Sequence, residues 1–484
     1  MADQSLTYSL DEALSTIGFG KFQGLVFAYA GLGWIAEAME IMILSFIGPA
    51  VQSEWGLSST EESMVSTVVF AGMLVGAYTI GLISDTYGRK KGFLGIAIVN
   101  TVAGFLSAFS PSYIWLVILR CLVGTGLGGG HVFLTWFLEF VPTPNRGTWM
   151  VTFSAFWTIG TIFEASLAWI VMPRLGWRWL LALSSAPSFA LLLFYGLTLE
   201  SPRYLYMKGR TAEAQDVLKK VALMNRTNLP PGNLGSDQLT KPEEESGLLE
   251  DTHFLSSTRK EIKDSKTRPS SLFQLFSKKL ITTTLLLWLI YFGHTFSYYG
   301  VILLTSELSS GKSKCSSIAL PSETMQNSSL YLDVFVTTFA EFPGLILSAI
   351  LVDRIGRKFS IEIMLVLGFI LLLPLVSRQH ETLTTTLLFG ARMFISTAFR
   401  VVSVYAAEAY PTSVRATGVG TATAIGRIGG MICPLVAVGL VSGCHQTAAV
   451  TLFEVVIVLS GLSVLFFPLE TKGRELIDTV SNSE

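Results

Sequence analysis

Charged side chains inside long apolar segments are the residues of this chain with the greatest capacity for chemistry. Glu37 and Glu40, in the stretch "WIAEAMEIM", lie in an apolar run from Phe22 to about Val51 that contains no Lys or Arg. Because the two glutamates are three residues apart, they share one face of a helix. We expect Glu37, nearer the middle of the run, to face a central cavity, where it would bind a proton, bind a substrate or pair with Arg427. We expect Glu40 to support it from the same face.

Single charged residues in other apolar stretches are further candidates. Arg427, in "AIGRIGG", offers a planar guanidinium that can hold a carboxylate through two hydrogen bonds; the alternative is an ion pair with Glu37, Glu341 or another buried acid. Glu341, in "FAEFPG", and Glu164, in "IFEASL", could each carry a coupling proton. Tyr298 belongs to a set of aromatic residues that could line a cavity for a flat organic substrate, although most aromatic residues of this kind pack against neighbours.

The composition indicates that these residues sit in a membrane. Hydrophobic residues make up 50% and charged residues 14% of the 484 residues, and the mean hydropathy is +0.54, which a soluble protein of this size would not show. A bilayer core about 30 Å thick needs roughly 20 apolar residues for each spanning helix. Because the alternating pattern of a membrane barrel is absent, the expected fold class is an all-α membrane protein. Twelve segments fit, near 22–51, 63–84, 91–110, 114–140, 147–172, 178–199, 280–308, 330–352, 359–377, 383–409, 416–441 and 446–469.

The chain repeats itself once. "GLISDTYGRKKG" (81–92) matches "AILVDRIGRKFS" (349–360), "EFVPTPNR" (139–146) matches "EAYPTSVR" (408–415), and "LESPR" (199–203) lies against "LETKG" (469–473), all at nearly the same offset. Each landmark follows the same helix of a six-helix set, so the sequence predicts two parallel six-helix repeats. Arg120 and Arg392 also fall at nearly matching positions, which favours a role in the scaffold for this pair.

The repeats divide the chain into five parts. They are a cytosolic N-terminus (1–21), an N-terminal six-helix half (22–199), a cytosolic linker (200–279), a C-terminal six-helix half (280–469) and a cytosolic C-terminus (470–484). Most of the 34 Lys and Arg residues then lie on the cytosolic side, as the positive-inside rule requires. Within the linker, "TAEAQDVLKKVALM" (211–224) has helical spacing, and the composition up to about residue 265 is typical of disorder.

Two features are expected on the opposite side of the membrane. Cys315 and Cys444 fall in or near outer loops and could form a disulfide if they approach each other. The sequon at Asn327, in the loop between the seventh and eighth helices, predicts glycosylation. The cysteines do not have the spacing of metal ligands, so we expect no metal site.

Several motifs resemble those of the major facilitator superfamily. Gly81, Asp85 and the run from Gly88 to Lys91 are similar to its signature, with a weaker copy from Asp353 to Lys358. "ESPRYL" (200–205) and "PLETKGR" (468–474) are similar to motifs that end each half. "AEAMEIMIL", "GWRWLLALSSAP", "FSYYGVILLTSEL" and "EAYPTSVRATGVGT" resemble the synaptic vesicle glycoprotein 2-related branch. The Gln-rich motif of sugar porters in the seventh helix is missing.

The resemblance implies a major facilitator fold with a substrate site near the midplane between the halves. It also implies secondary transport of a small organic ion by alternating access. In organic ion carriers a basic residue in the region of Arg427 accompanies anionic substrates, so the resemblance favours an anion or a zwitterion. Two alternatives stay open: an organic cation carrier that uses Glu37 and Glu40, and a membrane protein that binds a ligand or partner without transporting it.

Charged residues at the inner helix ends would form a gate in such a carrier. One close ion pair contributes roughly 4 kcal/mol at an effective dielectric constant of about 20, before desolvation, so several pairs would bias a conformational equilibrium without freezing it. We expect them to pair within and across the halves in the outward-facing state and to separate across the halves in the inward-facing state. They are Asp85, Arg89, Glu139, Arg146, Glu200, Arg203, Asp353, Arg357, Glu408, Arg415 and Glu470.

Motifs of catalysis are absent from the sequence. There is no Walker loop, metal-ligand cluster or G-x-S-x-G elbow, so we expect neither an enzyme nor a cofactor. The expected partners are an organic ion, a coupling proton or other ion, and the lipid bilayer, with no nucleic acid. We expect a monomer in the plasma membrane or in an intracellular vesicle.

Overall fold

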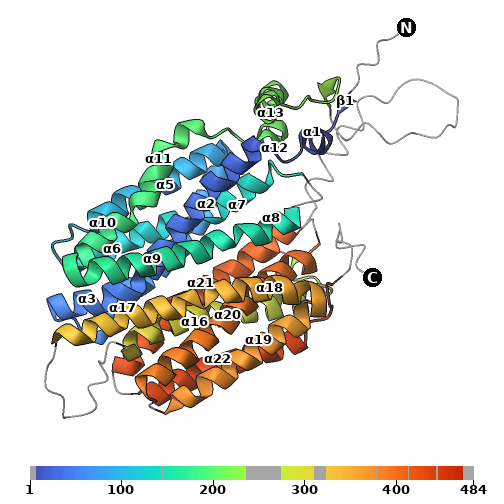
Figure 1. Cartoon of the computed structure of the whole chain (residues 1–484). Coiled ribbons are helices and arrows are strands. Elements are labelled where there is room, and N and C mark those ends of the chain that lie inside the picture. Colours follow the sequence, from blue (N-terminus) through green and yellow to red (C-terminus); the bar gives the residue numbers. More distant parts are fainter. Residues whose placement is uncertain are drawn as a thin grey trace, which may run out of the picture.

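The computed structural model describes residues 7–142, 146–235, 274–309, 323–377, 379–411, 414–442 and 445–472. Its helices form two groups that lie side by side along their length (Figure 1). The N-terminal half holds α2 (Lys21–Met42), α3 (Leu44–Trp55), α4 (Ser59–Tyr87), α5 (Arg89–Ser107), α6 (Tyr113–Leu127), α7 (His131–Leu138), α8 (Arg146–Phe153), α9 (Ala155–Leu175), α10 (Trp177–Ser184), α11 (Ala186–Leu193) and η2 (Tyr195–Leu197). The C-terminal half holds α16 (Ile281–Ser309), α17 (Glu323–Phe339), α18 (Glu341–Ile355), α19 (Arg357–Leu372), η4 (Leu373–Val376), α20 (Glu381–Ala409), α21 (Arg415–Ser442) and α22 (Gln446–Leu465).

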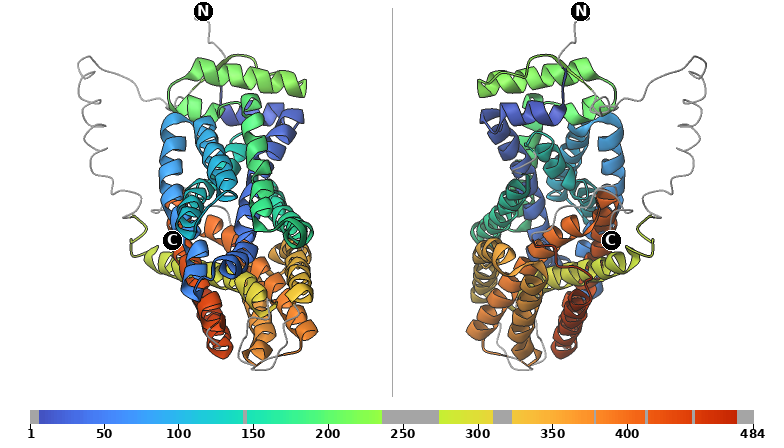
Figure 2. Two further views of the ribbon diagram at one scale, coloured as in Figure 1. Left: turned by 90° about the vertical axis from the view of Figure 1, so that its left-hand side faces the viewer. Right: turned by 90° about the vertical axis from the view of Figure 1, so that its right-hand side faces the viewer.

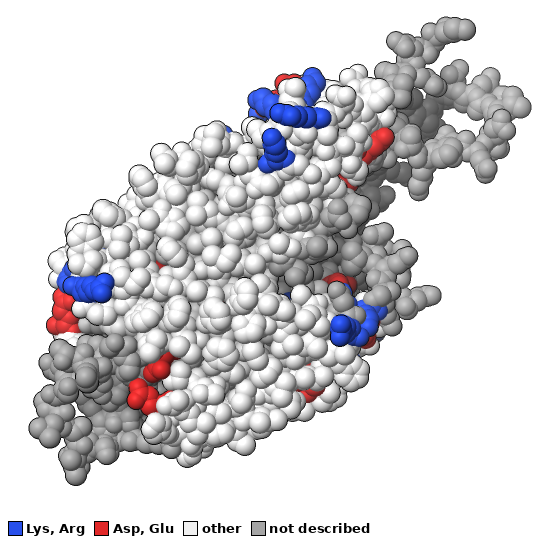
Figure 3. All heavy atoms as spheres, viewed as in Figure 1, with Lys and Arg blue, Asp and Glu red and all other residues white. Residues whose placement is uncertain are grey.

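Eleven helical segments in the described part of the chain are long and apolar enough to cross a membrane. The helix expected near 91–110 forms as α5 but falls outside this set. It begins with Arg89, Lys90 and Lys91 and carries Asn100 in its interior, and these residues lower its mean hydropathy. In Figure 3 the middle of the visible face is largely free of charge, and most charged side chains lie toward its ends, as expected of a surface in contact with lipid.

A collar of short elements covers one end of the N-terminal half. It consists of β1 (Thr7–Tyr8), α1 (Leu10–Ile17), α12 (Pro202–Met207), α13 (Thr211–Asn225) and β2 (Asn233–Leu234), in which β1 pairs with β2 in parallel. We call this end, which carries both chain termini in Figure 1, the terminal end. The side chain of Asn225 accepts a hydrogen bond from the Phe22 amide (2.9 Å) and donates one to Gln23 (2.7 Å), which fastens α13 to the start of α2.

Glycines bring α4 and α6 into close contact. A Cβ atom on Gly76 would overlap the Thr125 carbonyl oxygen, and one on Gly124 would overlap the Val69 carbonyl oxygen. Only glycine permits such an approach of two backbones, which in membranes replaces the hydrophobic effect as a source of helix association. Gly124, in the glycine-rich stretch that follows Arg120, therefore serves close helix packing.

Prolines divide some of the spans near their centres. Pro343 has no amide hydrogen to donate to the carbonyl of Phe339, and the helix is interrupted at Ala340, between α17 and α18. The interruption makes Glu341 the first residue of α18. Pro187, which follows Leu183 by one turn, lies beside the similar interruption between α10 and α11.

The two halves meet away from the terminal end. α3 lies against α16, α9 against α17, and α4 against α21. Aromatic rings of the two halves pack together here. Phe46 lies 6.1 Å from Tyr331, and Trp169 lies 5.6 Å from Phe335, measured between ring centroids. At the terminal end the space-filling view shows a hollow between the halves (Figure 3). In the described part of the chain, the halves therefore stand apart toward the end that carries the termini.

Replacing Gly76 by Ala tests the close contact of α4 with α6. The added methyl group must displace the backbone of α6, so we expect the free energy of unfolding to fall by about 1–3 kcal/mol. Gly439→Ala in α21 is the matched control, because a Cβ atom there would meet nothing and alanine favours a helix over glycine by about 0.5–1 kcal/mol. Thermal unfolding of the purified protein in detergent measures both, and equal shifts for the two variants would contradict the contact.

Candidate functional site

Glu37 and Arg427 form an ion pair between the two halves. Arg427 Nη2, on α21, lies 3.8 Å from Glu37 Oε1, on α2. The side chains remain 18% and 9% exposed although both residues lie near the middle of membrane spans. Because that depth is water-free outside the protein, their exposure indicates that the pair borders the space between the halves. The expected contact is present, and its role in transport stays a prediction.

The turn between α6 and α7 makes room for this pair. A Cβ atom on Gly130 would overlap Glu37 Oε2, so a larger residue at this position would displace the carboxylate. The ring of Tyr299 lies 4.7 Å from that of Phe70 and within electrostatic reach of both Arg427 and Glu37. The pair thus sits against an aromatic surface contributed by both halves.

Two arginines share the carboxylate of Glu341. Arg392 Nη2 donates a hydrogen bond of 2.8 Å to Glu341 Oε1, and both side chains are fully buried. Arg400 Nη2 lies 3.6 Å from Glu341 Oε2, and its side chain is 14% exposed. The Tyr298 hydroxyl donates a hydrogen bond of 2.7 Å to Glu341 Oε1. Two cations on one anion leave this cluster with an excess of positive charge.

Hydrogen bonds tie the Glu341 cluster to the N-terminal half. Trp157 Nε1, on α9, donates to the Tyr298 hydroxyl at 3.1 Å, and Arg400 Nη2 donates to the Thr158 hydroxyl at 2.9 Å. The rings of Tyr298 and Tyr299 lie 5.1 Å apart and join the cluster to the Glu37–Arg427 pair. We call the pair and the cluster together the central site. It contains Glu37, Arg427, Glu341 and Tyr298, and their binding of a substrate or proton stays a prediction.

Glu40 does not support Glu37, and that expectation is wrong. Arg120 Nη1 donates a hydrogen bond of 2.9 Å to Glu40 Oε2, with both side chains at most 1% exposed. Ser107 accepts two further hydrogen bonds from Arg120. A spacing of three residues turns a side chain by about 60° around the helix, which is enough to direct Glu40 into its own half while Glu37 reaches the other.

Glu164 belongs to the same interior of the N-terminal half. Its side chain is fully buried, and its two carboxylate oxygens lie 2.9 and 2.8 Å from the Ser184 hydroxyl. It lies within electrostatic reach of Glu40 and Arg120. The structure therefore separates Glu164 from the central site, and a role as a coupling-proton site is less supported than for Glu37.

The expected gate residues pair within each half in this structure. Arg89 forms ion pairs with Asp85 and with Glu139 (3.1 Å), and its amide donates to Glu200 at 2.8 Å. Arg203 pairs with Asp11 of α1.

In the C-terminal half the same arrangement recurs. Arg357 pairs with Glu408 at 2.8 Å, and its amide donates to Glu470 at 2.9 Å. Burial opposes ionisation of Glu470, but backbone amides, including those of Arg357 and Lys358, outweigh it and hold its pKa below the usual value.

Pairs across the halves are absent among the described gate side chains. This agrees with the opening at the terminal end, because residues at the inner helix ends can approach across the halves only when that end closes. A gate that closes across the halves stays a prediction. Arg146 and Arg415 begin α8 and α21, and Asp353 lies in α18, but their side chains fall outside the described residues.

Of the features expected on the outer side, the structure describes only the backbone at the sequon. Asn327 was expected in a loop, but the backbone of α17 already begins at Glu323, so the sequon lies in the first turns of a helix; its side chain is outside the described residues. Cys315 and Cys444 are also outside them, and their pairing stays a prediction.

Sequence reasoning missed the hydroxyl groups of the central site. Thr338 accepts a hydrogen bond of 2.9 Å from Arg392 Nη1, and Thr158 accepts one from Arg400. Thr338 precedes Glu341 by three residues, so a shared helix face was a usable signal. Nothing in the sequence marks Thr158. His294 is buried and stacks 6.0 Å from Phe399, which agrees with a packing role.

The fold and the central site together define a membrane carrier: two six-helix halves enclose a polar site near the midplane and contact each other away from the terminal end. The chain belongs to the family described as sugar (and other) transporters, which matches residues 21–480. It is a multi-pass membrane transporter of the major facilitator fold and not an enzyme.

Known proteins similar to this chain agree with that class. "Organic cation/carnitine transporter 7" of Arabidopsis thaliana is 58% identical over 100% of this chain and 99% of its own length. "Synaptic vesicle 2-related protein" of Xenopus laevis is 38% identical over 97% of this chain and 82% of its own length, which confirms the expected branch. A partially occluded inward open structure of the xylose transporter XylE from E. coli has a TM-score of 0.70 at 16% identity, covering 96% of this chain and 100% of that one, and it shares the fold.

A double-mutant cycle tests the structural role of the Glu40–Arg120 pair. Removing one partner leaves a buried charge without its counterion, so Glu40→Leu and Arg120→Leu should each lower the free energy of unfolding by about 3–5 kcal/mol. The double variant should lose less than the sum of the two, because no lone charge remains. Thermal unfolding in detergent measures the cycle. Additive losses would show that the pair does not couple the two side chains.

Proposed function

We propose that this carrier transports a small zwitterionic organic ion that bears both a carboxylate and an ammonium group. The observation that carries the proposal is the sharing of one glutamate by two arginines in the central site. Transport itself follows from the family; the substrate class is the proposed part.

The charge of the central site favours a carboxylate on the substrate. Glu37 and Arg427 balance each other, whereas Arg392 and Arg400 face the single charge of Glu341. Arg392 is satisfied by Glu341 and Thr338. Arg400 holds Glu341 only at 3.6 Å, and its Nη1 atom has no hydrogen-bond partner in the described chain. A substrate carboxylate on Arg400 would use that free donor, because a guanidinium binds carboxylates through two parallel hydrogen bonds.

The neighbouring rings favour an ammonium group at the other end of the substrate. Tyr298 stacks on Phe399, with centroids 6.3 Å apart, and Tyr299 lies beside Tyr298. Aromatic faces attract quaternary and primary ammonium groups, and Glu37 adds a negative charge nearby. The name of the Arabidopsis relative, which joins organic cations and carnitine, is consistent with this pairing of charges.

Glu37 is the group that we propose for coupling. It pairs with Arg427 across the halves at 3.8 Å, longer than a hydrogen bond, and it keeps some exposure. A proton on Glu37 would remove the charge that holds Arg427, so protonation and substrate binding would both act on the contact between the halves. We place the terminal end in the cytosol, following the distribution of Lys and Arg.

An organic cation carrier is the second candidate. Glu37 and the aromatic rings would suffice to bind a cation, and the name of the Arabidopsis relative favours this candidate as much as the first. Glu40 no longer contributes to it, since Arg120 neutralises its charge. The two candidates differ in whether Arg400 binds the substrate.

Uptake by proteoliposomes separates the two candidates. The labelled solutes are a carboxylate-bearing quaternary ammonium zwitterion, tetraethylammonium and a monocarboxylate. With Arg400→Gln we expect the apparent affinity for the zwitterion to fall roughly 10- to 150-fold, the value of one charged hydrogen bond. Arg354→Gln, at an exposed position of α18, is the matched control and should leave uptake unchanged.

Two results would contradict the proposal. One is zwitterion uptake that is insensitive to Arg400→Gln. The other is transport of tetraethylammonium alone, abolished by Glu37→Gln, which would establish the cation carrier instead. Binding of the solutes without flux would overturn transport by this chain altogether.

A further inference from the structure

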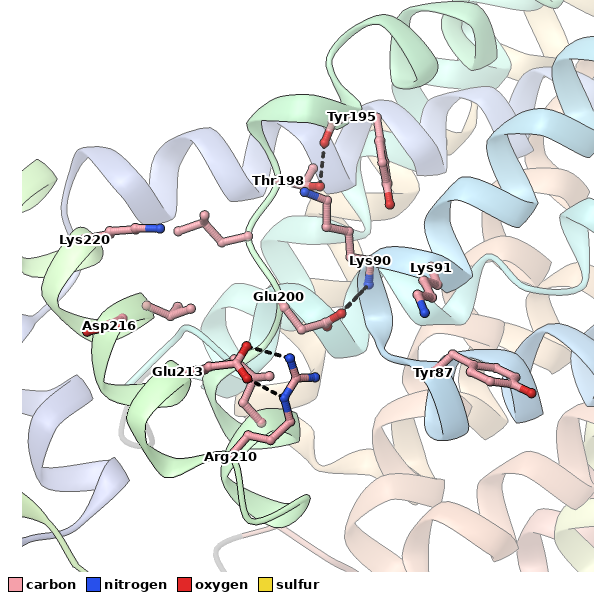
Figure 4. A pocket seen from close by; sticks show the side chains of 13 residues that line it. Tyr87, Lys90, Lys91, Tyr195, Thr198, Glu200, Arg210, Glu213, Asp216 and Lys220 are labelled. Carbon is pink, nitrogen blue, oxygen red and sulfur yellow. Dashed lines mark hydrogen bonds and ion pairs between the residues drawn. The ribbon is translucent and has the colours of Figure 1, made fainter.

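A separate cavity lies at the terminal end, outside the space between the halves. It has a volume of about 510 Å³, is open on one side, and is lined by the ends of α4 and α5, by η2 and by α12 and α13 of the collar (Figure 4). Four cations line it, namely Lys90, Lys91, Arg210 and Lys220. The central site does not share any of these residues.

The acidic residues of this cavity are already engaged. Glu200 accepts hydrogen bonds from the amides of Arg89 (2.8 Å) and Lys90 (3.3 Å) at the start of α5. Glu213 holds Arg210 through two hydrogen bonds of 2.7 and 2.5 Å.

The third acid, Asp216, faces Lys219 at 3.6 Å, and Lys219 is not a lining residue. The three lysines that line the cavity have no carboxylate partner among the described residues.

Aromatic rings position two of these lysines. The ammonium group of Lys90 lies 5.0 Å from the centre of the Tyr195 ring, and that of Lys91 lies 5.5 Å from the centre of the Tyr87 ring. Lys220 approaches the same cavity from α13 (Figure 4). Rings of this kind hold a cation in place without neutralising it, so the cavity keeps a positive charge in a defined arrangement.

The cavity opens beside the apolar surface of the spans. Tyr195 of η2 lines it, while Leu197 of the same short helix is 77% exposed and Leu193, just before it, is 69% exposed. Exposed leucines on membrane helices contact acyl chains. The cavity therefore lies where the acyl region ends and phospholipid headgroups begin.

We propose that this cavity binds a phosphate group carried by the headgroup of an anionic phospholipid, with Lys90, Lys91 and Lys220 as its ligands. The acyl chains would lie along Leu193 and Leu197, and the headgroup would join α13 of the collar to the start of α5. Basic cavities between membrane helices on the cytosolic side suit phosphorylated headgroups, because each basic residue adds to the attraction by the negative leaflet. A soluble organic phosphate would present the same phosphate group. The lipid differs from it by having acyl chains.

Native mass spectrometry of the full chain in detergent tests this proposal. The probes are a short-chain phosphatidylinositol phosphate, phosphatidylcholine with the same chains, and the free inositol bisphosphate headgroup. The test variant combines Lys90→Gln, Lys91→Gln and Lys220→Gln. The control combines Lys21→Gln, Lys208→Gln and Lys278→Gln, which removes the same charge from exposed lysines that do not line the cavity.

We expect the anionic lipid to bind the unaltered chain more tightly than phosphatidylcholine or the free headgroup. We expect its affinity for the test variant to fall roughly 100-fold, and its affinity for the control to change less than about threefold. Equal losses in both variants, or no loss in the test variant, would overturn the site. A free headgroup that binds as tightly as the lipid would overturn the lipid as its occupant. Lys220→Glu, confined to the collar, repeats the test if the triple variant does not fold.

Discussion

The absence of water from the bilayer core is the constraint on which this structure depends. Each buried charge must find a partner inside the protein, because an unpaired one is costly at that depth. The chain meets this requirement in two ways. Glu40 and Arg120 pair inside one half, at 2.9 Å and out of contact with solvent. Glu37 and Arg427 pair between the halves at 3.8 Å and remain partly exposed. The first arrangement holds a helix bundle together, and the second can be broken when the halves move.

The internal repeat has different consequences at the helix ends and at the centre. At the terminal end, Arg89 with Glu139 and Arg357 with Glu408 repeat one arrangement, and Glu200 and Glu470 each accept the amide at the start of a helix. At the centre the repeat fails. Arg120 and Arg392 hold nearly equivalent positions, but Arg120 pairs with a glutamate of the first span and Arg392 with one of the eighth. The two halves thus share the arrangement of their helix ends and differ in the charged residues at the centre.

The fold and the Glu37–Arg427 part of the central site could be predicted from the sequence, for physical reasons. Apolar length predicts spans, doubled motifs predict two halves, and the isolation of Glu37 and Arg427 in apolar runs made their contact a reasonable expectation. Glu341 was one of the partners considered for Arg427, yet it binds Arg392, since burial does not identify which cation lies nearest. The partner of Glu40 depends on a rotation of about 60° around α2, which spacing alone does not resolve. The place of Arg400 in the central site depends on its sharing the Glu341 carboxylate with Arg392. Side-chain packing determines that contact, and the sequence does not show it.

Transport by alternating access requires the two halves to open at one end while they close at the other, about a polar site at the midplane. Pulsed electron paramagnetic resonance in lipid nanodiscs measures this most directly, with one spin-label pair at Lys208 and Arg354 for the terminal end and another at Ser53 and Glu381 for the opposite end, all exposed positions. On adding the transported solute, we expect distance changes of opposite sign in the two pairs, shorter at the terminal end and longer at the other. Changes of the same sign, or none in either pair while uptake proceeds, would contradict it.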